Sequence, residues 1–433
     1  MGSIESSLSL TGNTGNCYDP LDPDGNITVA FDIFKWTDDG YMAKVTIQNY
    51  YQYLHVDRDG WQLGWTWASN EIILSMTGAF ALQQGNCSSF KGDEIPHCCK
   101  KDPVIVDMPE NAIPESRSEN CCHGGMISAK ATDPSKSSTS FDIKVGNLPG
   151  NSSGNLPQNV TLMAPGPGYT CSSFEDYPPT VYPGLGKREM QVFRTWKSEC
   201  TYSPFVAKKV PTCCVSLSTF YSPTITQCPT CSCGCRLETK SAGACLRHLS
   251  DSYSVGTEFI YDTGGLLRCT DHMCPVRVHW HVKNNYRDHW RVKVTVSNNN
   301  YGKNYSDWNL LIQHPGLSAS PRIYSFNSTL LPTVGFAEEV ALLWGLKNWN
   351  EMLLQSTDGR EGSVSTEILM GKNDHSFTFR NGWGLPRRIY FNGENCQMPL
   401  PDDFPMLPNG SCSLHPREHF FCLLIALYLI LKQ

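Results

Sequence analysis

Strict alternation of apolar and polar residues, beginning at Ile27, predicts β-strands in the first part of the chain. Residues 27–36 read ITVAFDIFKW and residues 41–50 read YMAKVTIQNY. In the second of these segments Ala43, Val45 and Ile47 alternate with Lys44, Thr46 and Gln48. Because successive side chains of a strand point to opposite faces, the pattern predicts a pair of half-buried antiparallel strands.

A later stretch repeats this pattern. The segment VRVHWHVKNNYRDHWRVKVTVSN, from Val276, aligns without gaps on ITVAFDIFKWTDDGYMAKVTIQN, from Ile27, at a constant offset of 249 residues. After a short deletion, WNLLI from Trp308 lies over WQLGW from Trp61. We interpret the two stretches as diverged copies of one β-sandwich. Two unrelated strand pairs that share strand chemistry are the alternative.

The region between the two copies differs in composition. It contains the Gly/Pro-rich passage APGPGYTCSSFEDYPPTVYPGLG, which is followed by a cysteine-dense segment. We therefore predict an all-β chain in which two immunoglobulin-like or carbohydrate-binding-module-like β-sandwiches flank a cysteine-rich module. The predicted boundaries are 17–165 for the first sandwich, 166–250 for the linker and cysteine-rich module, 251–402 for the second sandwich and 403–433 for a C-terminal signal.

One segment has a helical period instead of a strand period. In GFAEEVALLWGLKNWNEMLLQ, apolar residues recur at Val340, Leu343 and Trp344, and again at the two ends of the stretch Leu346 to Trp349. This spacing places them on one side of a helix and predicts a single short helix here.

Composition and charge narrow the function classes. The chain of 433 residues contains 20 cysteines. Only 18% of its residues are charged, and its net charge is −6. A chain with this charge gives no indication of nucleic acid or an anionic membrane surface as a partner. So many cysteines indicate an oxidising compartment.

The run QCPTCSCGC allows two interpretations. Its four thiols could ligate zinc, and Cys269, Cys274, His279 and His281 lie close together further on. Neither spacing matches two CxxC pairs separated by a loop, so we favour structural disulfides and expect no metal or other cofactor. The cysteines that we predict to be paired include Cys213, Cys214, Cys228, Cys231, Cys233 and Cys235.

The two ends of the sequence point to different compartments. The apolar run from Phe420 to Leu431 is too short to span a bilayer, and it follows a polar spacer and the small residues Asn409-Gly410-Ser411. This order is typical of a glycosylphosphatidylinositol (GPI) attachment signal, which predicts Asn409 as the attachment site and the outer leaflet of the plasma membrane as the anchorage. A hydrophobic C-terminal helix packed on the core is the alternative.

The opening residues, MGSIESSLSLTGNTGNC, contain no recognisable signal peptide and match a myristoylation pattern through Gly2 and Ser6. We give more weight to the tail and the cysteines, and expect an extracellular protein whose signal is missing from this sequence. Seven N-x-S/T sequons add weak support. They lie at Asn26, Asn86, Asn151, Asn159, Asn304, Asn327 and Asn409.

Tryptophans at period two suggest a binding surface. The segment GWQLGWTWAS places Trp61, Trp65 and Trp67 on one face of a strand, with Leu63 between them. Flat rings in a row suit a polysaccharide, because the apolar faces of its sugar rings stack on them. Trp36, Tyr41 and Tyr51 are further candidates nearby. Burial in the core is the competing interpretation, and the aligned Trp308 favours it for Trp61.

Three segments carry a family resemblance: GWQLGWTWASNEIILSMTGAFALQQGNCSSFKG, CCVSLSTFYSPTITQCPTCSCGC and RRIYFNGENCQMPLPDDFPMLPNGS. From about Tyr18 onward the chain resembles the COBRA-like family of plant GPI-anchored cell-wall proteins. The resemblance implies binding of cellulose or a related wall glucan and a role in microfibril orientation. On this sequence it assigns glucan binding to Trp61, Trp65 and Trp67, and the anchor to Asn409.

Catalysis is a weaker hypothesis. A glycoside hydrolase needs two carboxylates about 5 to 9 Å apart across a cleft. The acidic pairs Asp38-Asp39 and Glu338-Glu339 are adjacent in sequence, which is typical of solvated turns, and no HExxH or P-loop motif is present. We therefore predict no catalytic residues and no enzyme activity. A surface interaction protein without direct glycan binding is the other alternative.

Overall fold

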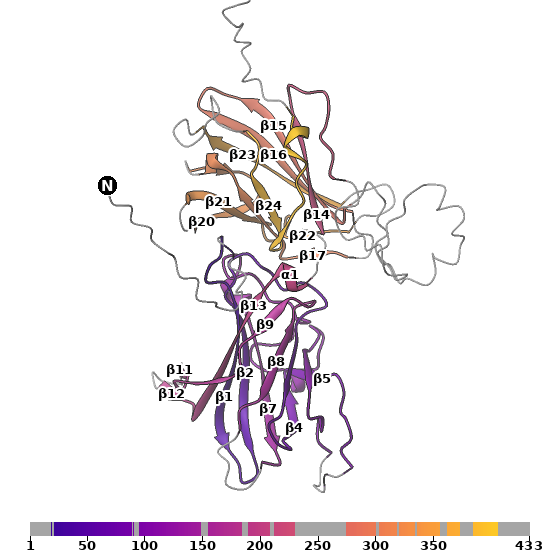
Figure 1. Cartoon of the computed structure of the whole chain (residues 1–433), viewed down its shortest axis with the longest axis vertical. Helices are drawn as coiled ribbons and strands as arrows, with labels where there is room; N and C mark the ends of the chain where they lie inside the picture. The colour runs from indigo at the N-terminus through magenta and orange to yellow at the C-terminus, as the bar shows by residue number, and fades with distance from the viewer. Residues whose placement is uncertain are drawn as a thin grey trace, which may run out of the picture.

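The chain is described from a computed structural model. It covers residues 19, 21–88, 90, 95–148, 155–183, 189–207, 212–229, 274–299, 303–317, 320–333, 336–355, 362–372 and 384–405. In these ranges the regular structure is almost entirely β-strand, with one short α-helix, α1 (Pro204–Ala207), which confirms the all-β prediction. Figure 1 shows two β-sandwiches stacked end to end, with the N-terminal one below.

The first sandwich consists of a seven-stranded and a four-stranded sheet. The larger sheet has the order β10 (Glu175–Tyr177), β13 (Arg194–Tyr202), β1 (Ile27–Trp36), β2 (Tyr41–Asn49), β7 (Ser138–Gly146) and β4 (Ile72–Thr77), with β9 (Tyr169–Cys171) also paired to β13. The smaller sheet has the order β5 (Ala79–Ala81), β6 (Val104–Asp107), β3 (Gln62–Thr66) and β8 (Gln158–Met163). A separate hairpin pairs β11 (Val181–Pro183) with β12 (Glu189–Gln191). One apolar core lies between the two sheets.

The second sandwich is built from two five-stranded sheets. One has the order β14 (Cys213–Thr219), β15 (Val276–Asn285), β16 (His289–Asn298), β23 (Gly362–Gly371) and β19 (Arg322–Ile323). The other has the order β20 (Asn327–Thr333), β21 (Phe336–Trp344), β18 (Asn309–Gln313), β24 (Arg388–Phe391) and β25 (Glu394–Asn395). A short pair, β17 (Tyr305–Ser306) and β22 (Met352–Leu353), completes it. Strand β14 runs parallel to β15.

The duplicated pattern corresponds to equivalent backbone structure. Strands β1 and β15 occupy equivalent positions at the offset of 249, and the register of each pair shifts at the same place, after Ile33 and after Val282. The buried Asn49 donates through Nδ2 to the carbonyl oxygen of Leu54, five residues on, at 2.9 Å. Asn298 likewise donates to the carbonyl of the fifth residue after it, at 2.7 Å. These shared details support our interpretation of two copies of one unit.

The helix predicted around Val340 is wrong, because this segment forms strand β21. Strand β21 pairs with β18 on one side and β20 on the other. Its Ala341 and Leu343 face the core of the second sandwich, while Val340 and Leu342 pack in the cluster between the sandwiches. A strand buried on both faces has a continuous apolar sequence, which removes the alternation that identifies a strand.

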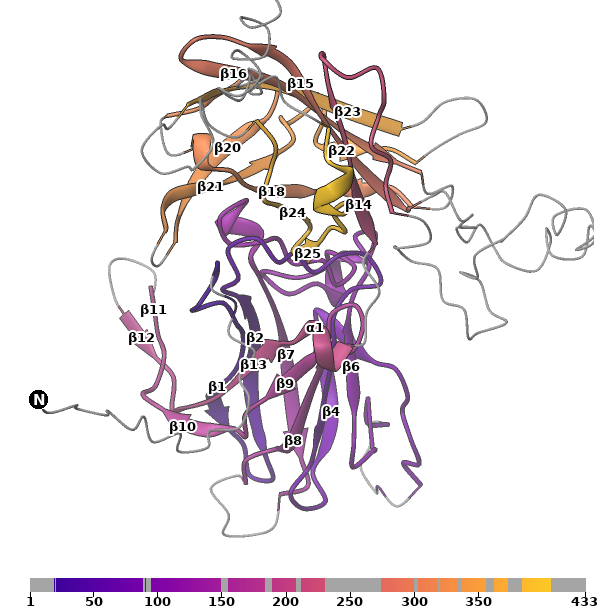
Figure 2. The ribbon, with the colours of Figure 1, turned by 45° about the horizontal axis from the view of Figure 1, so that its top comes forward.

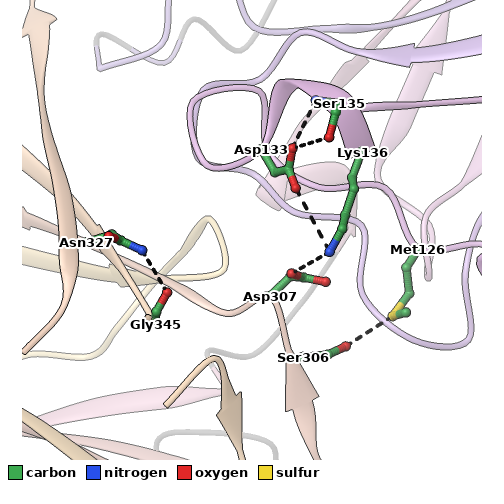
Figure 3. A network of polar contacts seen from close by, with 8 residues as sticks. All are labelled: Met126, Asp133, Ser135, Lys136, Ser306, Asp307, Asn327 and Gly345. Carbon is green, nitrogen blue, oxygen red and sulfur yellow. Dashed lines mark hydrogen bonds and ion pairs between the residues drawn. The ribbon is translucent and has the colours of Figure 1, made fainter. Parts of the chain in front are cut away.

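The two sandwiches are joined by a mixed apolar and charged interface. Leu21 and Tyr53 of the first sandwich pack against the outer face of the sheet that contains β18, and the Tyr53 and Tyr390 rings meet edge to face at 5.7 Å. Lys136 reaches across to Asp307 at 3.2 Å, as Figure 3 shows beside the contact between Ser306 and Met126. The interface therefore combines buried rings with ion pairs at its rim.

Several of the predicted disulfides are present. Cys213 pairs with Cys396 and Cys214 with Cys228, which confirms three of the six named cysteines. Cys231, Cys233 and Cys235 lie outside the described residues. Further bridges join Cys87 to Cys99, Cys121 to Cys122 and Cys171 to Cys200. Within the predicted linker and cysteine-rich segment, β9, β10 and β13 belong to the first sandwich and β14 to the second.

Replacing Asn49 by Ala should lower the free energy of unfolding by about 2–3 kcal/mol. The carbonyl oxygens of Leu54 and Ser128 lose their donor, and the backbone N–H of Tyr51 loses its acceptor, Asn49 Oδ1. Urea unfolding measures the change. Lys35→Ala, at an exposed position of the same sandwich, is the control and should change stability by less than about 0.5 kcal/mol. Equal unfolding midpoints for both variants would contradict the structural role of Asn49.

Candidate functional site

The tryptophan row predicted as a binding surface is buried. Trp61, Trp65 and Trp67 are only 1%, 2% and 1% exposed, and all three belong to the core of the first sandwich. The Trp61 ring stacks on Phe141 at 5.8 Å, and Trp65 meets Phe31 edge to face at 5.3 Å. The prediction of an exposed ridge is therefore wrong. These rings fill the space between the two sheets and offer no open face to a sugar.

The other predicted aromatic residues do not supply such a surface either. Tyr41 is 1% and Tyr51 7% exposed, and the hydroxyl of Tyr51 accepts a hydrogen bond from the backbone N–H of Tyr202 at 2.7 Å. Burial raises the pKa of Tyr51 to about 12, so its phenol stays neutral. Trp36 is half-buried and packs edge to face on Tyr41 at 5.8 Å. Of the six, only Trp36 reaches solvent, and it does so in part.

A different set of side chains is exposed on the first sandwich. We call it the outer apolar patch, and it consists of Phe34, Tyr177, Val181, Met190 and Phe193, which are 39%, 42%, 50%, 63% and 66% exposed. The backbone N–H of Phe193 donates to the carbonyl of Ile33 at 2.8 Å, which brings Phe193 beside Phe34. Val181 and Met190 lie on the two strands of the β11–β12 hairpin, where Met190 is opposite Tyr182 and Val181 opposite Gln191, so their side chains extend from its two faces. Exposed apolar side chains gathered in this way are typical of a contact surface.

Polar contacts fix the outer apolar patch in place. The Tyr182 hydroxyl of the hairpin donates to Asp32 at 2.6 Å, and Thr195 donates to the other oxygen of the same carboxylate at 2.6 Å. Beside them, the ammonium of Lys197 lies 5.0 Å from the centre of the Tyr177 ring. The hairpin is thus tied to the outer face of the larger sheet. Its apolar residues are held open to solvent on a rigid base.

Trp349 is a further exposed aromatic residue, on the second sandwich. It is 80% exposed, whereas the other tryptophans in the described ranges are buried or half-buried. It lies in a turn closed by the side chain of Asn350, whose Oδ1 accepts from the N–H of Leu346 at 2.6 Å. Trp349 is a single ring, flanked in sequence by the polar residues Asn348 and Asn350.

The zinc hypothesis finds no support among the residues described. No group of three His, Cys, Asp or Glu side chains there is placed to hold a metal ion. Cys228 and Cys274 are disulfide-bonded, so their thiolates are not available as ligands. His279 and His281 bond instead to a shared partner, Ser218, at 2.9 and 2.7 Å. Burial and nearby cations lower the pKa of His279 to about 4, so this ring is neutral at physiological pH.

The described carboxylates of the acidic pairs considered for catalysis lie in a turn or in an ion pair. Asp38 and Asp39 are exposed in the turn between β1 and β2. Glu339 forms an ion pair with Arg387 at 2.9 Å, and Glu338 is in a segment whose side chains are not described. Asp38, Asp39 and Glu339, the members of these pairs whose side chains are described, do not show the cleft geometry that glycoside hydrolysis requires.

Several predicted sites on the surface and in the tail remain predictions. Asn86, Asn159 and Asn304 are exposed, and Asn26 and Asn327 are half-buried. Asn151, Asn409 and the apolar run from Phe420 lie outside the described residues. Within the described ranges, no helix is both long and apolar enough to cross a membrane.

Comparison with known proteins identifies the family. The family model described as the COBRA N-terminal domain matches residues 41–203, and the COBRA family C-terminal domain matches residues 212–405. The chain belongs to the COBRA family. It is 47% identical to "Protein COBRA" of Arabidopsis thaliana over 411 residues, which are 94% of this chain and 89% of that protein. It is 49% identical to "COBRA-like protein 2" of the same plant over 407 residues, 93% of this chain and 91% of the relative. It is also 48% identical to "COBRA-like protein 1" of Oryza sativa subsp. japonica over 402 residues, 92% and 89% of the two chains.

The division of the two COBRA models agrees with the fold. The first ends at residue 203 and the second begins at 212, and α1 lies between these positions, where the chain passes from β13 to β14. The resemblance to the family seen in the sequence is therefore confirmed. The outer apolar patch lies mostly within the N-terminal COBRA domain, with Phe34 just before its matched part.

Trp65→Ala should lower the free energy of unfolding by about 3–5 kcal/mol, because it empties a large volume of the first core. Trp349→Ala is the matched control, since it removes the same side chain from an exposed turn and should cost less than about 0.5 kcal/mol. Thermal unfolding distinguishes the two. A Trp65→Ala protein as stable as the wild type would show that Trp65 is not a core residue.

Proposed function

We propose that this COBRA protein is a non-enzymatic protein of the plant cell surface that helps to organise cellulose in the wall. In this proposal a glycolipid attached at Asn409 anchors it to the outer leaflet of the plasma membrane. Direct contact with the glucan is made by the outer apolar patch of the first sandwich. Family membership supports the role in the wall, and the disulfides support an oxidising, extracellular setting.

One observation carries the proposed contact: three exposed aromatic side chains of the N-terminal domain lie on or beside the neighbouring strands β1, β13 and β10, and two exposed aliphatic side chains lie on the adjoining hairpin. The face of a cellulose crystal is flat and presents the apolar C–H faces of many glucose rings. Phe34, Tyr177 and Phe193 can stack on such rings, because their flat apolar faces cover the C–H surface of a sugar ring and remove it from water. A single exposed ring such as Trp349 covers less of a flat crystal face than three rings on neighbouring strands do.

The arrangement of the sandwiches is consistent with this role. The anchor signal follows the second sandwich in sequence, and the second sandwich is stacked on the first (Figure 1). The first sandwich then stands away from the membrane, with the second as a spacer. A site on the first sandwich can reach polymers of the wall beyond the membrane surface.

Tyr177→Ala combined with Phe193→Ala should weaken binding to microcrystalline cellulose about tenfold, since two stacked rings are lost. A pull-down with increasing amounts of cellulose measures the change, using the full chain from a secretory host. Phe205→Ala is the matched control, because Phe205 is 87% exposed but lies on α1, outside the patch. Both proteins should keep the unfolding temperature of the wild type.

Two results would refute the assignment of the outer apolar patch as the contact surface, and a third would refute the non-enzymatic role. Full retention of cellulose binding by the double variant would remove the patch as the contact surface. Loss of binding in Trp349→Ala, with the patch variant unaffected, would place the contact on the second sandwich. Release of reducing sugars from glucan by the wild type would overturn the non-enzymatic role.

A further inference from the structure

The second sandwich has a strongly basic outer face. The sheet β14-β15-β16-β23-β19 contains five cationic residues and one carboxylate in its strands, and the alternation of its strands places all six side chains away from the core. We call this surface the basic face. It consists of Arg277, Lys283, Arg291, Lys293 and Arg322, together with Glu367. The positive charge is local, because the chain as a whole carries a net charge of −6.

The single carboxylate neutralises only part of this charge. Glu367 forms ion pairs with Lys283 and Arg291, and these two cations lower the pKa of its carboxyl group. Lys293 and Arg322 are exposed and form no ion pair with any side chain in the described part of the protein. Two uncompensated cations therefore lie on the same sheet face.

A shallow hollow of about 540 Å³ lies on the basic face. Arg291, Lys293 and Glu367 line its floor, and Tyr286 and Tyr324 contribute aromatic rings that are 41% and 58% exposed. Both rings have defined positions. The backbone N–H of Tyr324 donates to the carbonyl of Glu367 at 3.2 Å, and Tyr286 stacks on His289 at 4.4 Å.

The basic face points away from the rest of the molecule. The opposite sheet of this sandwich, which contains β18 and β21, packs against the first sandwich. In Figure 2, β15, β16 and β23 lie at the far side of the second sandwich from the first one. The surface is therefore accessible independently of the outer apolar patch.

We propose that the basic face binds an acidic polysaccharide, a chain of uronate sugars, with carboxylates paired to Lys293 and Arg322 and sugar rings against Tyr286 and Tyr324. The combination of features selects this ligand. Exposed tyrosine rings suit sugar rings, and unpaired cations beside them suit a sugar that carries a carboxylate at each residue. A neutral glucan has no charged group to pair with the cations. Proteins that bind an anionic lipid surface usually insert apolar residues into it, and among the described residues that line the hollow Leu369 is the one aliphatic side chain.

The experiment measures binding of the full chain to polygalacturonate by affinity electrophoresis, with a chelator present to prevent calcium cross-linking. Fully methyl-esterified polygalacturonate is the matched ligand, because it has the same backbone without the charge. We expect binding to the acidic form, little binding to the ester, and weaker binding at high salt because exposed charge pairs are screened. Lys293→Gln combined with Arg322→Gln should weaken binding about tenfold.

Lys35→Gln combined with Lys101→Gln is the control variant, since it removes the same charge from exposed positions of the first sandwich. Tyr324→Ala tests the ring contact and should also weaken binding. Equal binding to the acidic and esterified polymers, or unchanged binding in the Lys293/Arg322 variant with its fold intact, would overturn the proposal. Equally tight binding to vesicles of anionic phospholipid would assign the face to a membrane instead. Cellulose binding by the Lys293/Arg322 variant should be unchanged. The proposals for the basic face and for the outer apolar patch therefore fail or succeed separately.

Discussion

Packing between two sheets is the constraint on which this structure depends. Facing sheets of a sandwich lie about 10 Å apart, and the space between them has to be filled to the density of a solid. In this protein indole rings fill much of that space. Trp65 of β3 and its flanking residues Trp61 and Trp67 enter the first core from one sheet, and Trp196 of β13 enters it from the other. The second core uses Trp280, Trp290 and Trp308 in the same way. Residues committed to this filling are unavailable for binding, so any contact surface has to be made by other side chains.

This constraint explains which sequence-based predictions succeed. The pairs β1–β2 and β15–β16 each have one buried and one polar face, so alternation identified them, and the duplication followed from the alignment. The same alternation shows that Trp61, Trp65 and Trp67 share a face, but not whether that face points into the sandwich or out of it. Only the position of the second sheet decides this. Strand β21, buried on both sides, lost its alternation and resembled a helix.

The outer apolar patch was beyond the reach of such patterns for a related reason. Phe34 lies at the register shift of β1, Phe193 directly precedes β13, and Val181 and Met190 lie on a short hairpin rich in proline and glycine. Residues that are distant in sequence are brought together by strand pairing, with no period of their own. The basic face could be predicted from the sequence, since two neighbouring strands alternate buried residues with the cations Arg277, Lys283, Arg291 and Lys293. The sequence does not show, however, that Glu367 forms ion pairs with two of these cations, Lys283 and Arg291.

Together the two surfaces define a chain with different chemistry at each end. An apolar, aromatic surface on the first sandwich is suited to a neutral glucan, and a cationic surface on the second is suited to an acidic polysaccharide. A protein that holds both polymers gains from linkage, because binding one raises the effective concentration of the other, provided that both sites can be engaged at the same time. The interface adds a fixed relative orientation of the two sandwiches. Tyr53 and Tyr390 are largely buried in it, and the ion pairs of Lys136 with Asp307 and of Lys303 with Asp57 brace its rim. A flexible hinge would let the orientation of the two surfaces vary, whereas this packed junction keeps them in one orientation, which a protein that aligned two polymers would need.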